Sequence, residues 1–298
     1  MTIGISAICN HGKNIITTTD GMLSADISAD LSAFKVQFYG DWLFAFAGSL
    51  SNADLIMEEI RQEVVKDASV LSRGKIQSTL RRAYKKRQSA WVTDRNLAPY
   101  DMDMGEFKKE GQNIFGEKLF GELDHVMRSD LVNFNEYVIV TGWGKAELSA
   151  MIYKMTPDGA VSASLDGFTA IGSGANVATN VLMSLGCTRD APVEFALYAV
   201  AAAKFSAESC DGVGESTVLL VTHKRRPDDA LGTSPVQIVQ PNEVNELRKL
   251  WETYSKPRFP EEAVTKLCDI AKKVVGEVSA EAGIRGMIHA VNSAIQQP

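Results

Sequence analysis

The order of strand and helix patterns along the first 222 residues constrains the fold of this chain most. β-branched and apolar runs predict four strands in two pairs, at 3–8, 14–19, 33–38 and 42–46. Two helices follow, the first with Ile56, Ile60 and Val64 at four-residue spacing and the second over about 77–91. The pattern then repeats, with strands at 137–141, 148–155, 160–164 and 168–171, helices at about 175–185 and 191–208, and a strand at 217–222. An α+β arrangement of two stacked sheets, with a helix pair on each outer face, satisfies this order.

Two segments stand outside this pattern. Residues 92–130 contain Pro99 and several glycines without a regular period, so we interpret about 92–130 as an insertion. The composition changes again after His223, where a charged linker begins and residues 242–295 read as amphipathic helix. We therefore predict a first domain over residues 1–224 and a linker with a helical C-terminal extension over 225–298.

Composition and charge exclude several classes of protein. The chain has 298 residues, of which 45% are hydrophobic and 23% charged, so disordered and fibrous classes do not apply. The net charge of −6 does not favour a nucleic-acid partner, and the basic run 81–87 is best interpreted as a solvated helix face. The four cysteines and four histidines are scattered, with no CxxC pair and no HExxH. We predict no disulfide framework, no metal site and no other cofactor.

The N-terminus and the hydropathy pattern bear on location. The first residues lack a basic region followed by an apolar run, so no signal peptide is predicted. No apolar stretch reaches the ~18 residues that a membrane span needs. We expect a cytoplasmic protein without a membrane partner.

The opening residues carry a candidate nucleophile. The chain begins Met-Thr-Ile-Gly-Ile, so removal of Met1 would leave Thr2 as a free N-terminal threonine. Such a residue combines a hydroxyl nucleophile and an α-amine base, which is a recognised way to activate an alcohol for covalent catalysis.

Four segments, in order, resemble one known family. They are TIGI with the later Asp20 and Lys35, FAFAGSLSNAD at 44–54, AIGSGANVAT at 170–179, and the stretch 194–222. Together, residues 1–222 resemble a proteasome-type β subunit, a member of the N-terminal-nucleophile hydrolases. The direct position of Thr2 behind Met1 is similar to the bacterial heat-shock-type protease of this family. The resemblance implies a four-layer αββα sandwich of two antiparallel sheets.

The resemblance also implies roles for the residues around the nucleophile. Thr2 would attack an amide carbonyl while its own α-amine, which titrates at about 7.7–8.0 when unperturbed, takes the proton. Lys35 matches the family's lysine, whose ammonium lowers the pKa of nearby groups. Asp20 would pair with Lys35 and hold it charged.

Further matches concern the oxyanion and the substrate. Gly48 matches the glycine whose N–H forms the oxyanion hole, a donor worth roughly 3–4 kcal/mol. Phe46 would line the pocket for the residue before the scissile bond. Ser173 matches the serine that contacts the terminal amine, and Asp211 matches the supporting aspartate before the last strand.

Some positions depart from the family pattern. Ile3 stands where family members usually carry a second threonine, and Gly214 stands where a serine is expected. Alignment on Gly4 instead would move the nucleophile slot to Met1 or before it. The run 172–174 opens a helix as a phosphate loop does, but no GK[ST] follows, which disfavours nucleotide binding.

These residues lead to one function and two alternatives. We expect a threonine-type peptidase subunit that works in a homo-oligomeric ring on peptides or unfolded proteins. An ATP-dependent unfoldase is a further partner that the resemblance implies. The alternatives are a catalytically inactive structural or binding subunit and an amidohydrolase of small amides.

Overall fold

The N-terminal β-branched runs form the centre of the first sheet. In the computed structural model, which describes residues 3–20, 35–39, 41–66, 72–144, 149–224 and 236–254, β1 (Ile3–Cys9) and β2 (Asn14–Asp20) make an antiparallel hairpin. β8 (Phe168–Gly172) pairs with β1, and β9 (Thr217–His223) pairs with β2. β10 (Val236–Ile238) pairs with β9, so the strand order is β10-β9-β2-β1-β8.

The second sheet is a meander of five strands. Its order is β3-β4-β5-β6-β7, and every neighbouring pair is antiparallel. The strands are β3 (Val36–Tyr39), β4 (Trp42–Ala47), β5 (Tyr137–Gly142), β6 (Met151–Thr156) and β7 (Gly159–Ser162).

Strand alternation in β4 separates two cores. Leu43, Ala45 and Ala47 belong to the core between the sheets, where they meet Ile8 and Ile15 of the first hairpin. The aromatic side chains of the same strand point the other way, into a core shared with the two helices on that side, and they are Trp42, Phe44 and Phe46. Because both faces of β4 are covered, the strand reads as a continuous apolar run.

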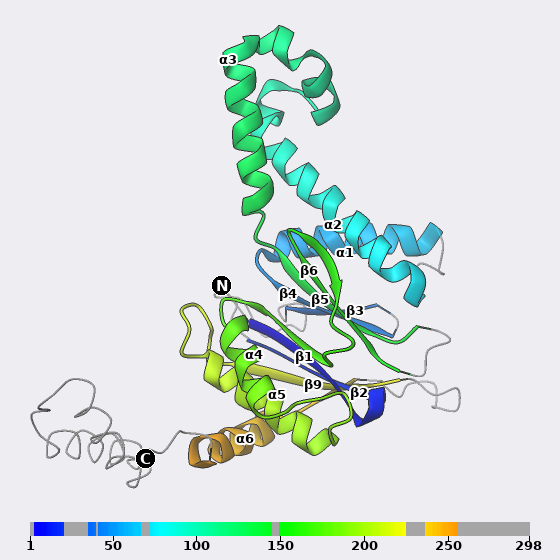
Figure 1. Ribbon diagram of the computed structural model, residues 1–298, viewed down its shortest axis with the longest axis vertical. Helices are drawn as coiled ribbons and strands as arrows, with labels where there is room; N and C mark the ends of the chain where they lie inside the picture. Colours follow the sequence, from blue (N-terminus) through cyan, green and yellow to red (C-terminus); the bar gives the residue numbers. More distant parts are fainter. Residues whose placement is uncertain are drawn as a thin grey trace, which may run out of the picture. The chain divides into compact units, whose positions relative to one another are not determined.

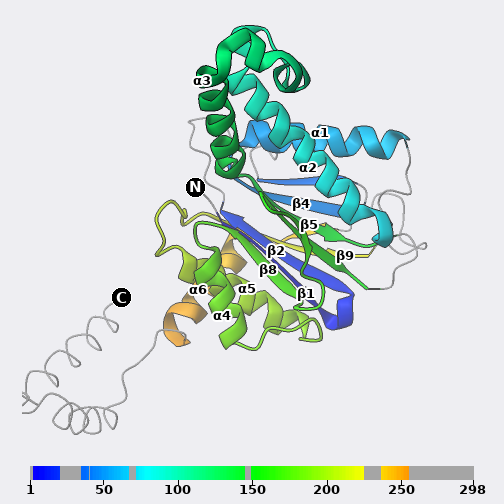
Figure 2. The ribbon, with the colours of Figure 1, turned by 45° about the horizontal axis from the view of Figure 1, so that its top comes forward.

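Helices cover both outer faces, as Figures 1 and 2 show. α1 (Leu50–Lys66) and α2 (Arg73–Asn96) pack on the second sheet through residues such as Ile56, Ile60 and Tyr84. α4 (Ala175–Ser184) and α5 (Val193–Ala207) cover the first sheet. Buried alanines let α5 lie close to β1 and β2. The predicted four-layer αββα sandwich of two antiparallel sheets is therefore confirmed.

One segment differs from the sequence prediction. We expected residues 92–130 to lack a regular pattern, but α2 continues to Asn96 and α3 spans Met104–Asn133. α3 begins at a capping box and bends at Gly116, whose φ is 72°. A separate apolar cluster joins α3 to the end of α2, and it includes Val92, Leu97, Phe107 and Met127. The far end of this helical hairpin extends away from the sheets in Figure 1.

The C-terminal part is described only as far as α6 (Pro241–Tyr254). The chain divides into two compact units, Met1–Leu247 and Arg248–Pro298. The boundary that we predict after residue 224 adjoins residues 225–235, and most of the predicted helical extension follows residue 254. Both lie outside the described residues and remain predictions. None of the described helices combines the length and the apolar composition that crossing a bilayer requires.

Candidate active site

The strand register brings several predicted site residues to one end of the sandwich. In the first sheet, Ile3 at the start of β1 pairs with Gly172, and Asp20 at the end of β2 pairs with Thr217. Ile3 and Asp20 lie at the same end because the hairpin pairs Gly4 with Thr19. In the second sheet, the pairing of Val36 with Ala45 places the start of β3 beside the end of β4.

A buried ion pair connects the two sheets at this end. The Lys35 ammonium donates to Asp20 Oδ1 at 3.0 Å, and the exposed fractions of the two side chains are 10% and 0%. Asp20 ends β2 in one sheet, whereas Lys35 immediately precedes β3 in the other. The Lys35 carbonyl also accepts a hydrogen bond from Phe46 N at 2.9 Å, which ties the lysine to β4 two residues before Gly48. The predicted partnership of Asp20 and Lys35 is present in the structure.

A second buried lysine extends the network. Gly214 N donates to the other carboxylate oxygen of Asp20 at 3.5 Å, while the Gly214 carbonyl accepts from Lys204 Nζ at 2.5 Å. Lys204 lies on α5 with its side chain fully buried, and it pairs with Glu208 at 2.5 Å. Gly214, which replaces the expected serine, therefore contributes through its backbone. The loop before β9 is held to the ion pair in this way.

Gly48 ends β4 in a conformation that requires glycine. Its φ is +129°, and a Cβ there would come within 2.0 Å of Glu136 Oε2 and 2.9 Å of the Asn135 carbonyl oxygen. The turn itself is exposed to solvent. A glycine N–H is therefore carried on an exposed turn at the same end of the sandwich as the ion pair.

The carboxylate of Glu136 holds the far side of this turn. Glu136 Oε2 accepts from Ser49 N at 2.8 Å, and Oε1 accepts from the Asn52 amide at 2.8 Å. Asn52 in turn accepts from Arg87 on α2, with Nη2 at 3.1 Å. Burial raises the pKa of Glu136 above its usual 4.5, and the hydrogen bonds from Asn52 and Ser49 and the charge of Arg87 only partly oppose that rise.

The other predicted site residues lie as follows. Thr2 falls outside the described residues. Ser173 follows β8 directly and is exposed, and Asp211 is exposed in the loop before β9. Phe46 is 4% exposed and packs in the core under α1 and α2. The roles that we predict for these four residues remain predictions.

Sequence reasoning missed two residues of this region, Glu136 and Lys204. Lys204 could have been found, because it is a lone charge in the apolar helix 193–207 with Glu208 four residues later. Glu136 carries no comparable signal, since a single glutamate before a strand is common. Its importance depends on the pairing of β4 with β5, which brings residue 136 beside Gly48.

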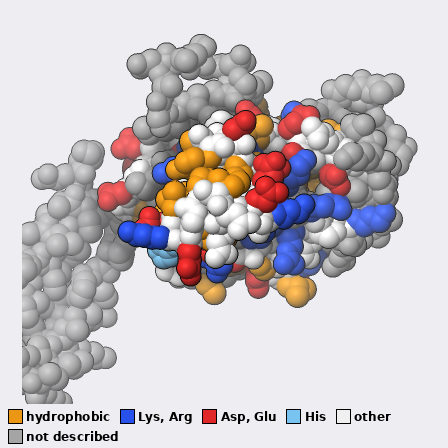
Figure 3. All heavy atoms as spheres, turned by 90° about the horizontal axis from the view of Figure 1, so that it is seen from above, with side chains coloured by type: hydrophobic (Ala, Val, Ile, Leu, Met, Phe, Trp, Pro, Cys, Tyr) orange, Lys and Arg blue, Asp and Glu red, His pale blue; other side chains and the backbone are white. Residues whose placement is uncertain are grey.

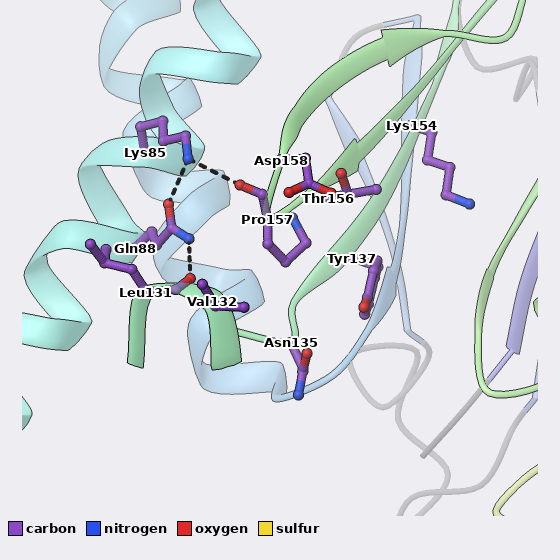
Figure 4. A pocket seen from close by; sticks show the side chains of 10 residues that line it. All are labelled: Lys85, Gln88, Leu131, Val132, Asn135, Tyr137, Lys154, Thr156, Pro157 and Asp158. Atoms are coloured by element: carbon purple, nitrogen blue, oxygen red, sulfur yellow. Dashed lines mark hydrogen bonds between the residues drawn. The ribbon is translucent and has the colours of Figure 1, made fainter. Parts of the chain in front are cut away.

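A separate hollow of about 600 Å³ lies between the helices and the β6–β7 turn (Figure 4). In it Lys85 donates to Gln88 and to the Pro157 carbonyl. Lys154 points away from this group in the figure, and burial lowers its pKa. None of the predicted catalytic residues lines this hollow. Within the described ranges, no three His, Cys, Asp or Glu side chains are grouped so that they could hold a metal ion.

Comparison with known proteins identifies the fold. No family model and no curated protein matches the sequence. Two solved structures match it in three dimensions. One is Anbu, described as an ancestral beta-subunit, from Yersinia bercovieri, with a TM-score of 0.56. The other is the Anbu (Gly-1) mutant from Hyphomicrobium sp. strain MC1, with a TM-score of 0.54. Each is 13% identical to this chain, and the match covers 94% of this chain and 100% of the other.

These matches correct the family assignment made from the sequence. We assigned residues 1–222 to the proteasome-type β subunits, close to the bacterial heat-shock-type protease, whereas the matching structures are Anbu proteins. An identity of 13% carries the proteasome-like fold and does not carry family membership. The motif resemblance was too short and too scattered to separate these groups of proteins. The fold is shown, and the activity has to be argued from the site.

Proposed function

We propose that this chain is a threonine-type peptidase subunit whose nucleophile is Thr2, exposed when the residue before it is removed. One observation carries the proposal, namely the buried pair of Lys35 and Asp20 at the same end of the sandwich as Gly48 and the start of β1. Burying a charged pair is costly, and it is compensated here by good geometry only in part, so a functional reason for keeping it is favoured.

The alternation of β1 supports Thr2 over its neighbours. Gly4 faces the second sheet, because a Cβ at that position would meet Ile171 and Ala45. Ile3 faces the helices, since it lies against the place of a Cβ on Gly174 beside α5. Thr2 has the same parity as Gly4, and the ammonium of Lys35 joins the two sheets at this end. A nucleophile at position 2 is therefore compatible with the lysine, whereas position 3 is not.

The proposed reaction has two steps. Thr2 Oγ attacks the carbonyl carbon of a peptide bond, and its proton passes to the Thr2 α-amine, directly or through a water. The tetrahedral intermediate carries a negative oxygen that the Gly48 N–H stabilises. The intermediate collapses to an ester as the peptide C–N bond breaks, and the leaving nitrogen takes the proton from the α-amine. Water then attacks the ester, and Thr2 regains its hydroxyl proton when the acid is released.

Lys35 has an electrostatic role in this scheme. An ammonium beside the α-amine disfavours the protonated amine by like-charge repulsion, so more of the amine is available as a base near neutral pH. Asp20 keeps the ammonium in place, and the Gly214 and Lys204 contacts keep Asp20 in place.

The assembly and the substrate belong to the same proposal. We propose a closed homo-oligomeric ring that encloses the sites and admits peptides or unfolded protein, with an ATP-dependent unfoldase as the supplier of substrate. The description of one matching structure as a beta-subunit supports assembly. Exposed Ser173 and Asp211, which have no hydrogen-bond partner among the described residues, favour one competing function, an inactive structural subunit.

Intact mass and N-terminal sequencing of the purified protein test the nucleophile first. The expected result is a chain that begins at Thr2 with a free amine. A fluorogenic peptide panel then compares wild type with Thr2→Ala, and Thr188→Ala, which changes an exposed threonine, serves as the matched control. We expect activity in wild type and T188A and its loss in T2A. A blocked Thr2 amine, or activity that survives in T2A, would refute the proposal, and turnover of small amides alone would favour the amidohydrolase.

A further inference from the structure

Glu136 occupies a position that the proposed chemistry does not yet explain. It is 8% exposed, it immediately precedes β5, and its carboxylate lies against the α-carbon of Gly48. The backbone carbonyl of Glu136 accepts a hydrogen bond from Tyr84 Oη at 2.6 Å. Main chain and side chain are thus both held in place.

The two oxygens of this carboxylate have different partners. Oε2 accepts from Ser49 N, the residue between Gly48 and α1, and Oε1 accepts from Asn52 in the first turn of α1. A negative charge at the N-terminus of a helix is favoured by the helix dipole. Both bonds fix the path of the chain where β4 turns into α1, which is the path that orients the peptide unit of Gly48.

The partner of the carboxylate is itself fixed. Arg87 Nε and Nη2 both donate to Asn52 Oδ1, at 3.3 and 3.1 Å. The Asn52 amide group must therefore direct its nitrogen at Glu136 and its oxygen at Arg87. This chain leads from α2 through α1 to the residue before β5, and it defines which atoms Glu136 meets.

We propose that Glu136 is a positioning residue for the oxyanion hole, because its carboxylate holds the turn at Gly48 and Ser49 in the conformation that directs the Gly48 N–H at the reacting carbonyl. The proposal rests on the proposed peptidase function, which assigns the Gly48 N–H to the oxyanion. It adds a residue that touches neither the substrate nor the nucleophile.

Glu136→Gln is the sharpest variant, because the side chain keeps its shape and loses one acceptor. The single amide oxygen of the substituted side chain cannot replace both carboxylate oxygens, which accept from Ser49 N and from Asn52. Asn52 cannot turn to help without directing its nitrogen at Arg87. Glu110→Gln, which changes an exposed carboxylate on α3, is the matched control. We expect kcat of E136Q on a fluorogenic peptide to fall about tenfold to a hundredfold, with KM within about twofold of wild type.

A second measurement does not depend on activity. Hydrogen exchange followed by mass spectrometry on the full-length protein reports the opening of residues 48–53. We expect exchange there to be about tenfold faster in E136Q, because Ser49 N–H loses a charged acceptor. The exchange of β1 and β9 is expected to match wild type, which checks that the variant is folded.

The outcomes separate this proposal from the proposed function. Faster exchange at 48–53 with a loss of kcat alone supports both. Faster exchange in a protein whose wild type has no activity supports the holding of the turn and refutes the peptidase. If wild type is active and E136Q matches E110Q in kcat and in exchange, Glu136 does not position the turn and the inference is overturned.

Discussion

At the scale of single residues, the pair of Asp20 and Lys35 has the largest predicted effect on stability. The pair is buried and lies between two sheets, with 3.0 Å between the Lys35 Nζ and Asp20 Oδ1 atoms. Asp20→Asn would leave the lysine charge buried without its counter-charge, so the free energy of unfolding should fall by about 3–5 kcal/mol. Urea denaturation of the full chain at neutral pH measures this loss.

The double variant Asp20→Asn with Lys35→Met gives the internal check. Because both charges are gone, it should be more stable than Asp20→Asn alone, although it should have no peptidase activity. Asp124→Asn is the exposed control, since it breaks the pair with Arg128, whose side chain is 76% exposed, and should cost about 0–1 kcal/mol. Equal losses for D20N and D124N would contradict the interpretation of the buried pair.

Glu136 gives the pH dependence that this site predicts. Burial raises the pKa of its carboxyl above 4.5, so the folded protein holds the proton more tightly than the unfolded chain. The resulting stability is present below pH 4.5 and is lost as the pH rises through the folded pKa. The free energy of unfolding of wild type should therefore fall relative to that of Glu136→Gln as the pH rises from about 4.5 to about 7. Parallel curves in urea titrations across this range would contradict the direction of the shift.

At the scale of elements, the strands could be predicted because their patterns are local. Runs such as residues 14–19 and 217–222 are apolar or β-branched along most of their length, and the structure places β2 and β9 there. α3 could not be predicted, because four glycines interrupt it and its apolar residues form only a small cluster with the end of α2. Short β10 was missed for another reason, since three residues carry no period.

The site divides in the same way. Asp20, Lys35 and Gly48 follow from positions along the chain, and the structure gives the first two the expected partnership. Glu136 and Lys204 act through contacts with residues elsewhere in the sequence, on Ser49 and on Gly214. Those contacts follow only from the pairing of β4 with β5 and from the packing of α5 on β2, which no local pattern specifies.

The first turn of α3 tests whether the hairpin depends on its capping box. Asp103 accepts from Glu106 N at 2.8 Å, and Glu106 accepts from Asp103 N at 3.0 Å. Asp103→Ala should destabilise this turn by about 1 kcal/mol and speed amide exchange at residues 103–107. Glu110→Ala, at an exposed position further along the helix, should leave the exchange at residues 103–107 unchanged. Unchanged exchange in D103A would show that the apolar cluster alone holds the start of α3.

At the scale of the whole molecule, the surface bears on assembly. Figure 3, which looks down on the molecule from above, shows apolar side chains gathered among acidic and basic ones. Exposed apolar residues of the hairpin include Ile114 and Val132, which are 57% and 73% exposed. Apolar surface of this kind on a protruding element is favourable for contact with another protein.

A closed ring makes a definite prediction about mass. Head-to-tail contacts that close give one discrete number of copies, whereas contacts that do not close give a spread of sizes. Native mass spectrometry of the full-length protein should therefore show one dominant species at an integer multiple of the 32.4 kDa chain. Val132→Glu and Ile114→Glu, each compared with Glu110→Gln, should reveal whether the hairpin takes part, because a buried charge at an interface weakens it. A monomer at every concentration would exclude the ring, and a continuous ladder of sizes would indicate an open assembly that leaves the proposed sites unenclosed.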